Sequence, residues 1–121
     1  MEKKLKKCSM LLKSLILHYH GLDEDEKKIL EGAAVKLKAE EELEWANEFI
    51  SEDYLSAFER CKEFFSKNMV DYSNEIKLSQ LKEVWEENHQ KGYVTEMETT
   101  AMINLAKDWG VEHEMLMIIQ D

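Results

Sequence analysis

The amino-acid sequence predicts an all-α protein, folded as a single bundle of about six or seven helices built from two related halves. Three observations favour this fold class. The chain has no proline and only four glycines among 121 residues, and it is rich in helix formers such as Glu, Lys and Leu. Apolar residues recur at helical spacing, whereas no alternating apolar and polar run is long enough for a strand. One domain covering residues 1–121 is expected at this length.

The clearest local signal lies between Gly92 and Gly110. Thr95 has the type and place of a helix N-cap, and Glu98, three residues later, completes a capping box. Val94 stands where a hydrophobic staple would pack against the new helix. One apolar stripe then follows, formed by Ala101, Met102, Leu105, Ala106 and Trp109. The segment predicts a helix that begins after Thr95 and ends at a C-terminal glycine.

The N-terminal part repeats this arrangement more faintly. We expect a first helix from about Glu2 to Tyr19, ended by Gly21. Asp23 and Glu26 then have the spacing of a second capping box, which predicts the start of a second helix. Aligning the two boxes places Asp23 on Thr95 and Glu26 on Glu98, and this is the basis for two related halves.

Between the two boxes the sequence predicts three further elements. A break near Lys38–Glu40 separates the second helix from a new apolar stripe. Ser51 is expected to cap a helix over about Glu52–Asn68, and the apolar stripe of that helix comprises Leu55, Phe58, Cys61, Phe65 and Met69. A helix over about Glu75–Lys91 follows, with Ser73 or Asn74 as its cap.

The segment Gly92-Tyr93-Val94-Thr95-Glu96-Met97-Glu98 resembles the signature of the TerB-like, tellurite-resistance family, and the likeness is fainter over residues 21–26. The resemblance implies a helical bundle of two related halves, divalent metal bound at acidic positions, and a link to tellurite and other stress responses. This chain departs from the family where Asp precedes Gly, because His20 and Lys91 stand at those positions. Of the family's acidic positions only Glu26 and Glu98 are matched.

Candidate functional residues are few, and none is expected to be catalytic or to bind a cofactor. We predict no metal site, with Glu26, Glu98 and His20 as the alternative ligands, because the capping boxes already account for both glutamates. The capping boxes alone predict that Glu98→Gln is milder than Thr95→Ala, since glutamine can complete the box. The sequence shows no nucleophile elbow, phosphate loop or complete zinc motif, so we expect no enzyme activity.

Composition narrows the possible partners. A net charge of −10 repels phosphate backbones, which argues against nucleic acid. Cys8 and Cys61 lack metal or redox spacing and are expected to be buried, reduced thiols of a cytoplasmic protein. The apolar run Met10–Leu17 follows four lysines, but it is too short to span a bilayer, so no membrane insertion is expected.

The C-terminal tail is the one sequence feature that indicates a binding surface. After Gly110 a short helix is expected to lay one face on the core. Apolar residues occupy more than that one face, and we take the possible interface as Met115, Leu116, Met117 and Ile119. The sequence therefore predicts a non-catalytic cytoplasmic interaction or assembly module that binds a protein partner or itself. The alternative is a divalent-metal-binding protein of tellurite and stress resistance.

Overall fold

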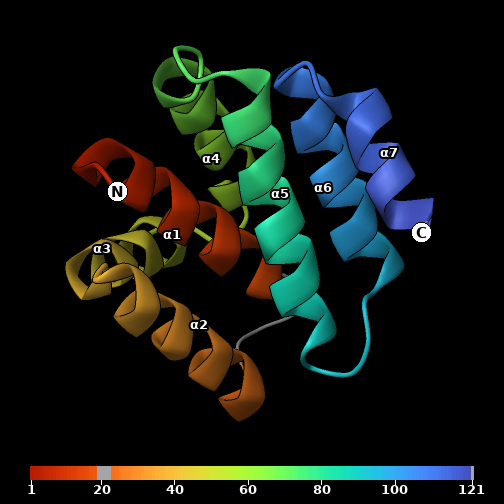
Figure 1. The fold of residues 1–121 in the computed structure, drawn as a ribbon. Coiled ribbons are helices and arrows are strands. Elements are labelled where there is room, and N and C mark those ends of the chain that lie inside the picture. Colours follow the sequence, from red (N-terminus) through yellow and green to blue (C-terminus); the bar gives the residue numbers. More distant parts are fainter. Residues whose placement is uncertain (19–22, 121) are drawn as a thin grey trace.

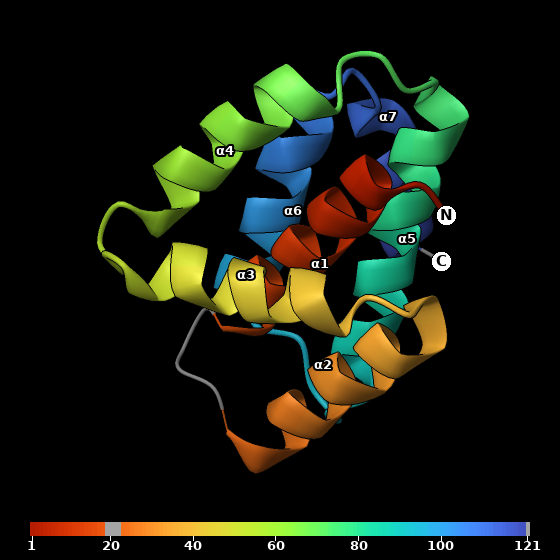
Figure 2. The ribbon, with the colours of Figure 1, turned by 90° about the vertical axis from the view of Figure 1, so that its left-hand side faces the viewer.

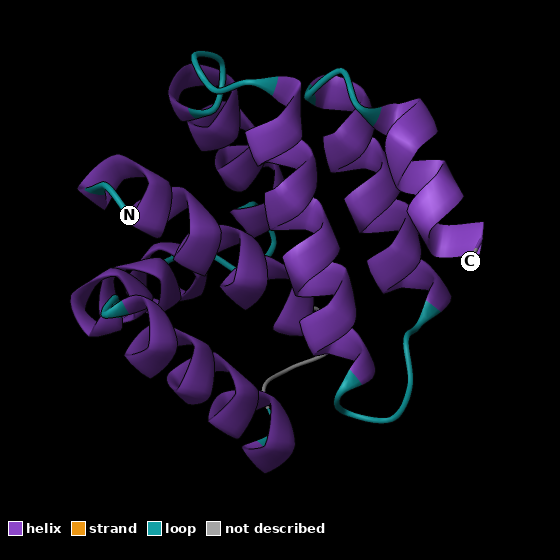
Figure 3. Ribbon diagram, in the orientation of Figure 1, coloured by secondary structure: helices purple, strands orange, loops and turns teal. Residues whose placement is uncertain are grey.

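The computed structural model describes residues 1–18 and 23–120, and all regular structure in these residues is helical (Figures 1 and 3). The helices are α1 (Lys3–Leu17), α2 (Glu24–Leu37), α3 (Glu40–Ser51), α4 (Ala57–Asn68), α5 (Asn74–His89), α6 (Glu96–Asp108) and α7 (Glu112–Gln120). They pack as one domain, so the predicted all-α class is confirmed for the described residues. The expected end of the first helix, with Tyr19, His20 and Gly21, lies outside them.

The central element is α1. Every residue from Cys8 to Leu17 is buried, because α2, α3, α4, α5 and α6 all contact this helix. A helix surrounded in this way needs apolar residues on most of its circumference. The run Met10–Leu17 therefore belongs to the core of the bundle rather than to a surface stripe. Lys13 lies within this run and is buried with it, which the sequence analysis did not predict.

The second half of the chain packs beside α1 as a group of three helices. Figure 1 shows α5, α6 and α7 side by side, with α7 in contact with both of the others. Val111 and Met115 carry the apolar face of α7 into the core. Gly110, with a φ of 77°, ends α6 in a left-handed turn, and the N–H of Val111 donates to the carbonyl of Ala106 at 2.9 Å. This is the glycine C-cap predicted at this position.

The break between α2 and α3 lies where the sequence placed it. Lys38 adopts a left-handed conformation with a φ of 54°, and α3 begins two residues later at Glu40. The buried Ala39 fills the corner between the two helices.

The boundary between α3 and α4 differs from the prediction. Ser51 ends α3 instead of capping the next helix, and α4 begins only at Ala57. Leu55 was predicted to face the core, but 99% of it is exposed. The physical reason is local: the carboxylate of Asp53 accepts from the N–H of Leu55 at 3.1 Å, which offers the backbone an alternative to the helix.

None of the helices formed by the described residues has the length and hydropathy that a bilayer span requires.

Candidate functional site

Both predicted capping boxes are present. At the start of α2, Asp23 Oδ1 accepts from the N–H of Glu26 at 2.8 Å, and Glu26 Oε1 accepts from the N–H of Asp23 at 3.2 Å. At the start of α6, Thr95 Oγ1 accepts from the N–H of Glu98 at 3.1 Å, and Glu98 Oε1 accepts from the N–H of Thr95 at 2.8 Å. Each box satisfies two backbone donors that a helix start leaves free.

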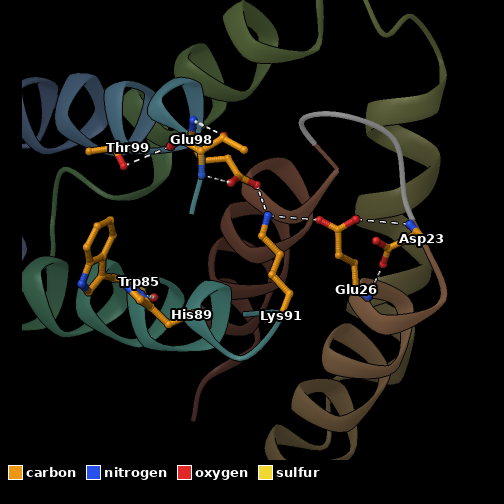
Figure 4. A network of polar contacts seen from close by, with 8 residues as sticks. Asp23, Glu26, Trp85, His89, Lys91, Glu98 and Thr99 are labelled. Atoms are coloured by element: carbon orange, nitrogen blue, oxygen red, sulfur yellow. Dashed lines mark hydrogen bonds and ion pairs between the residues drawn. The ribbon is translucent and has the colours of Figure 1, made fainter. Parts of the chain in front are cut away.

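The two boxes meet at one lysine (Figure 4). Each glutamate uses Oε1 for its own cap and turns Oε2 toward Lys91, which lies just after α5. Lys91 Nζ is 3.4 Å from Glu26 Oε2 and also donates to Glu98 Oε2. The exposed fractions of the three side chains are 2% for Lys91, 5% for Glu26 and 0% for Glu98. The starts of α2 and α6 and the end of α5 are therefore joined by a buried ion-pair bridge, which we call the Lys91 bridge.

The electrostatics of the Lys91 bridge favour the ionised form of Glu98. Burial alone would raise the pKa of Glu98, but hydrogen bonds from Lys91 and from both the backbone and side chain of Thr95 outweigh it. The net effect holds the pKa of Glu98 below its ordinary value. Lys91 makes one further contact. Its Nζ lies 4.8 Å from the centre of the Tyr93 ring, within the range of a cation–π interaction.

Chemically, the Lys91 bridge is a cation site that already contains its cation. Divalent ions such as Ca²⁺ and Mg²⁺ require about six or more oxygen ligands. Here each glutamate has one oxygen on a backbone donor and the other on the ammonium. Among the described residues, no group of three or more Cys, His, Asp or Glu side chains is placed to hold a metal. His20, the alternative third ligand, lies outside those residues.

The role of Lys91 was missed by sequence reasoning. The residue was noted only as a departure from the TerB-like pattern, at the place of an aspartate before Gly92. A signal was present in that departure. It puts a basic residue seven positions before Glu98, and a lysine so placed is a candidate partner for a buried carboxylate.

A second buried lysine was missed as well. Lys13 in α1 is 1% exposed, and its Nζ lies 2.8 Å from Glu83 Oε1 and 3.2 Å from Glu87 Oε1 in α5. It also donates to Ser9 Oγ at 3.2 Å. Burial raises the pKa of Glu87, although Lys13 opposes this effect. The only sequence signal was a lysine inside an otherwise apolar run, which argues for a buried partner of opposite charge.

The two cysteines and a histidine show no reactive environment. Cys8 and Cys61 are buried free thiols, and burial raises their pKa to about 11 and about 12. A thiol with such a pKa is a poor nucleophile because the thiolate form is scarce. His18 is partly buried, with Nε2 3.0 Å from Asn47 Oδ1, and burial lowers its pKa despite that hydrogen bond.

The C-terminal helix only partly matches the predicted interface. Met115 is fully buried in the core, so it offers no surface to a partner. Leu116 and Ile119 are half-buried, and 57% of Met117 is exposed. The reason is the crossing of α7 over α5 and α6, which covers the Val111–Met115 face and leaves Met117 on the opposite side.

No family model, curated protein or solved structure matches the chain.

Proposed function

We propose that the chain is a non-catalytic interaction or assembly module of the cytoplasm, with a design similar to that of TerB-like domains. The Lys91 bridge carries this proposal. Its three charged groups are buried and bonded to one another and to the backbone, so they hold α2, α5 and α6 together and every carboxylate oxygen already has a donor. In such a molecule the surface, rather than an internal site, is the part that acts on other molecules.

The surface supports a binding role. The chain carries a net charge of −10, yet several large apolar side chains are exposed on it, namely Val35, Tyr54, Leu55, Val70, Tyr93, Met97 and Met117. Tyrosine and methionine are common at protein interfaces because they bury large or adaptable apolar area. The free thiols of Cys8 and Cys61 support a reducing compartment.

The test of partner binding uses α7. Leu116→Glu with Met117→Glu adds two charges to the partly exposed apolar side of this helix, and His113→Glu with Gln120→Glu is the matched control at exposed polar positions. Binding partners are first identified by cross-linking in the cells that naturally produce the chain. Each partner is then purified, and its affinity for the chain is measured by calorimetry. We expect the first variant to bind at least tenfold more weakly and the control to bind normally. Equal binding by both variants would exclude α7 from the interface.

The second candidate is a divalent-metal-binding stress protein, favoured by the convergence of Glu26 and Glu98 on one point. Calorimetry with Mg²⁺, Ca²⁺ and Zn²⁺ separates the two functions. We expect no stoichiometric micromolar binding, because Lys91 and two backbone N–H groups already occupy the oxygens of both carboxylates. Such binding to the unaltered chain, abolished by Glu26→Ala or Glu98→Ala and kept by the exposed control Asp25→Ala, would establish the metal-binding function instead.

A further inference from the structure

The loop between α3 and α4, residues 52–56, lies at one edge of the molecule (Figure 2) and carries two exposed apolar side chains. Leu55 is 99% exposed and Tyr54 is 64% exposed. Acidic residues surround them, with Glu52 and Asp53 just before the pair and Glu59 in the first turn of α4. We call residues 52–56 the acidic loop.

The acidic loop is held in place rather than free. Arg60 donates to the carbonyls of Phe49 at 2.7 Å and Asp53 at 2.8 Å, and also to Ser56 Oγ at 2.8 Å. Ser56 Oγ in turn donates to Asp53 Oδ2 at 3.0 Å. A loop fixed in this way loses little conformational entropy when it binds, which is the advantage of a preorganised contact.

A surface of opposite charge lies on the same chain. Lys3, Lys4 and Lys7 of α1 line a hollow of about 340 Å³ together with Phe64 and Asn68 of α4. A cavity of about 150 Å³ can hold a benzene-sized group, so this space admits a leucine side chain. Among the described residues, no carboxylate forms an ion pair with Lys3 or Lys7. We call this the basic hollow.

The acidic loop and the basic hollow cannot meet within one molecule. Leu55 precedes the first residue of α4, whereas Phe64 and Asn68 lie in its second half. The 12 residues of α4 form a rigid rod, about 18 Å long at 1.5 Å per residue. Figure 2 agrees, because the loop lies at the edge opposite the N-terminus of α1. Only a second copy can bring the two surfaces together.

We infer that this chain assembles with copies of itself in a head-to-tail manner, with Leu55 of one copy seated in the basic hollow of the next. This inference rests on the proposed assembly function and names its partner. The lysines that line the hollow would face the exposed carboxylates of Glu52 and Asp53, whose side-chain partners within the chain are Arg60 at 3.9 Å and the Ser56 hydroxyl at 3.0 Å. Phe64, which also lines the hollow, would supply apolar contact for Leu55. Because two different surfaces meet, each added copy leaves one loop and one hollow free, and the assembly grows into a chain or closes into a ring.

The two surfaces can be disabled separately. Leu55→Asp removes the apolar contact of the acidic loop, and Lys3→Glu with Lys7→Glu reverses the charge of the basic hollow. The second change places acidic residues in the first turns of α1, where the helix dipole favours them, so α1 is expected to remain folded. Val35→Asp is the matched control, since Val35 is an exposed apolar residue of α2 outside both surfaces.

Sedimentation across a range of concentrations tests the inference, with circular dichroism as a check of folding. We expect the unaltered chain and Val35→Asp to rise above the monomer mass of 14.3 kDa with concentration, and to fall back toward it as salt screens the charges. Each surface variant alone should stay monomeric. A mixture of the two should form a 1:1 dimer and nothing larger, because only one intact loop and one intact hollow remain.

Other results overturn the inference. A monomeric unaltered chain would exclude self-assembly, while the proposed binding of a different protein would still be measured by the α7 variants. Assembly that survives both surface variants would place the contact elsewhere. Folded variants that stay monomeric when mixed would show that the acidic loop and the basic hollow do not recognise each other.

Discussion

Lys91 Nζ lies 3.4 Å from Glu26 Oε2, although the two residues belong to different halves of the chain. Glu26 is in the first turn of α2, and Lys91 follows the last turn of α5. The same ammonium holds Glu98 in the first turn of α6. Three helix ends are thus fixed by one buried charge, and the stability of the fold should depend on it.

The first prediction concerns this lysine. Lys91→Met leaves the buried carboxylates of Glu26 and Glu98 without a counter-charge, and breaking a buried ion pair costs about 3–5 kcal/mol. We expect the free energy of unfolding at pH 7 to fall by about that amount in chemical denaturation. Lys82→Met, at an exposed position of α5, is the control and should change it by less than about 0.5 kcal/mol. A loss below about 1 kcal/mol for Lys91→Met would show that the Lys91 bridge contributes little.

The second prediction reverses the order expected from the capping boxes alone. Thr95→Ala removes an N-cap and should cost about 1 kcal/mol. Glu98→Gln keeps the cap but replaces the charge-assisted hydrogen bond from Lys91 by a neutral one, with Glu26 left as the remaining carboxylate partner, and we expect a larger cost of about 2–3 kcal/mol. Urea unfolding of both variants at neutral pH decides the order. If Glu98→Gln were the milder of the two, Glu98 would act as a cap only.

The third prediction concerns acid. The pKa of Glu98 is lower in the folded protein than the ordinary value of 4.5, so the unfolded chain binds its proton first as the pH falls. The stability that Glu98 contributes is therefore fully present above pH 4.5 and is lost as the pH falls through the lower pKa of the folded state. Unfolding at a series of pH values should show a shallower acid loss for Glu98→Gln than for the unaltered chain. If the stability of both proteins fell equally steeply with pH, the lowered pKa of Glu98 would not contribute to the acid loss.

Glu87 has the opposite effect on the pH dependence of the free energy of unfolding. Its pKa is raised in the folded state, chiefly by burial, so its contribution to stability is lost as the pH rises through that raised value. For this reason the comparison between the unaltered chain and Glu98→Gln is the informative one, since both retain Glu87.

The parts of the fold that could be predicted are those specified by local sequence. Each capping box needs only two residues three positions apart, and Gly110 needs only a helix before it. Leu55 was misplaced because helical spacing does not show the competing bond from its own N–H to the Asp53 carboxylate, which Arg60 reinforces by donating to the Asp53 carbonyl. The helical spacing of Leu55 was correct, but the helix that would have buried it begins after it.

The two capping boxes of the candidate site were predictable, but the contact between them was not. Glu26 and Glu98 were identified as caps from their own neighbours, whereas their convergence on Lys91 depends on how α2, α5 and α6 pack. The burial of Lys13 has the same origin, because its partners Glu83 and Glu87 are about 70 residues away in sequence. Contacts between distant segments leave no local pattern in the sequence.

The last prediction compares two glycines. Gly32 lies inside α2 with an ordinary backbone, and an added Cβ would meet nothing within 4 Å. Gly32→Ala should therefore stabilise the protein by about 0.5–1 kcal/mol, because alanine restricts the unfolded chain and favours the helix. Gly92 has equal space for a Cβ but a φ of 94°, so Gly92→Ala should destabilise by about 1 kcal/mol or more. Thermal and chemical unfolding measure both variants. A destabilising Gly32→Ala would show that position 32 does not have the free space and ordinary helical backbone assigned to it.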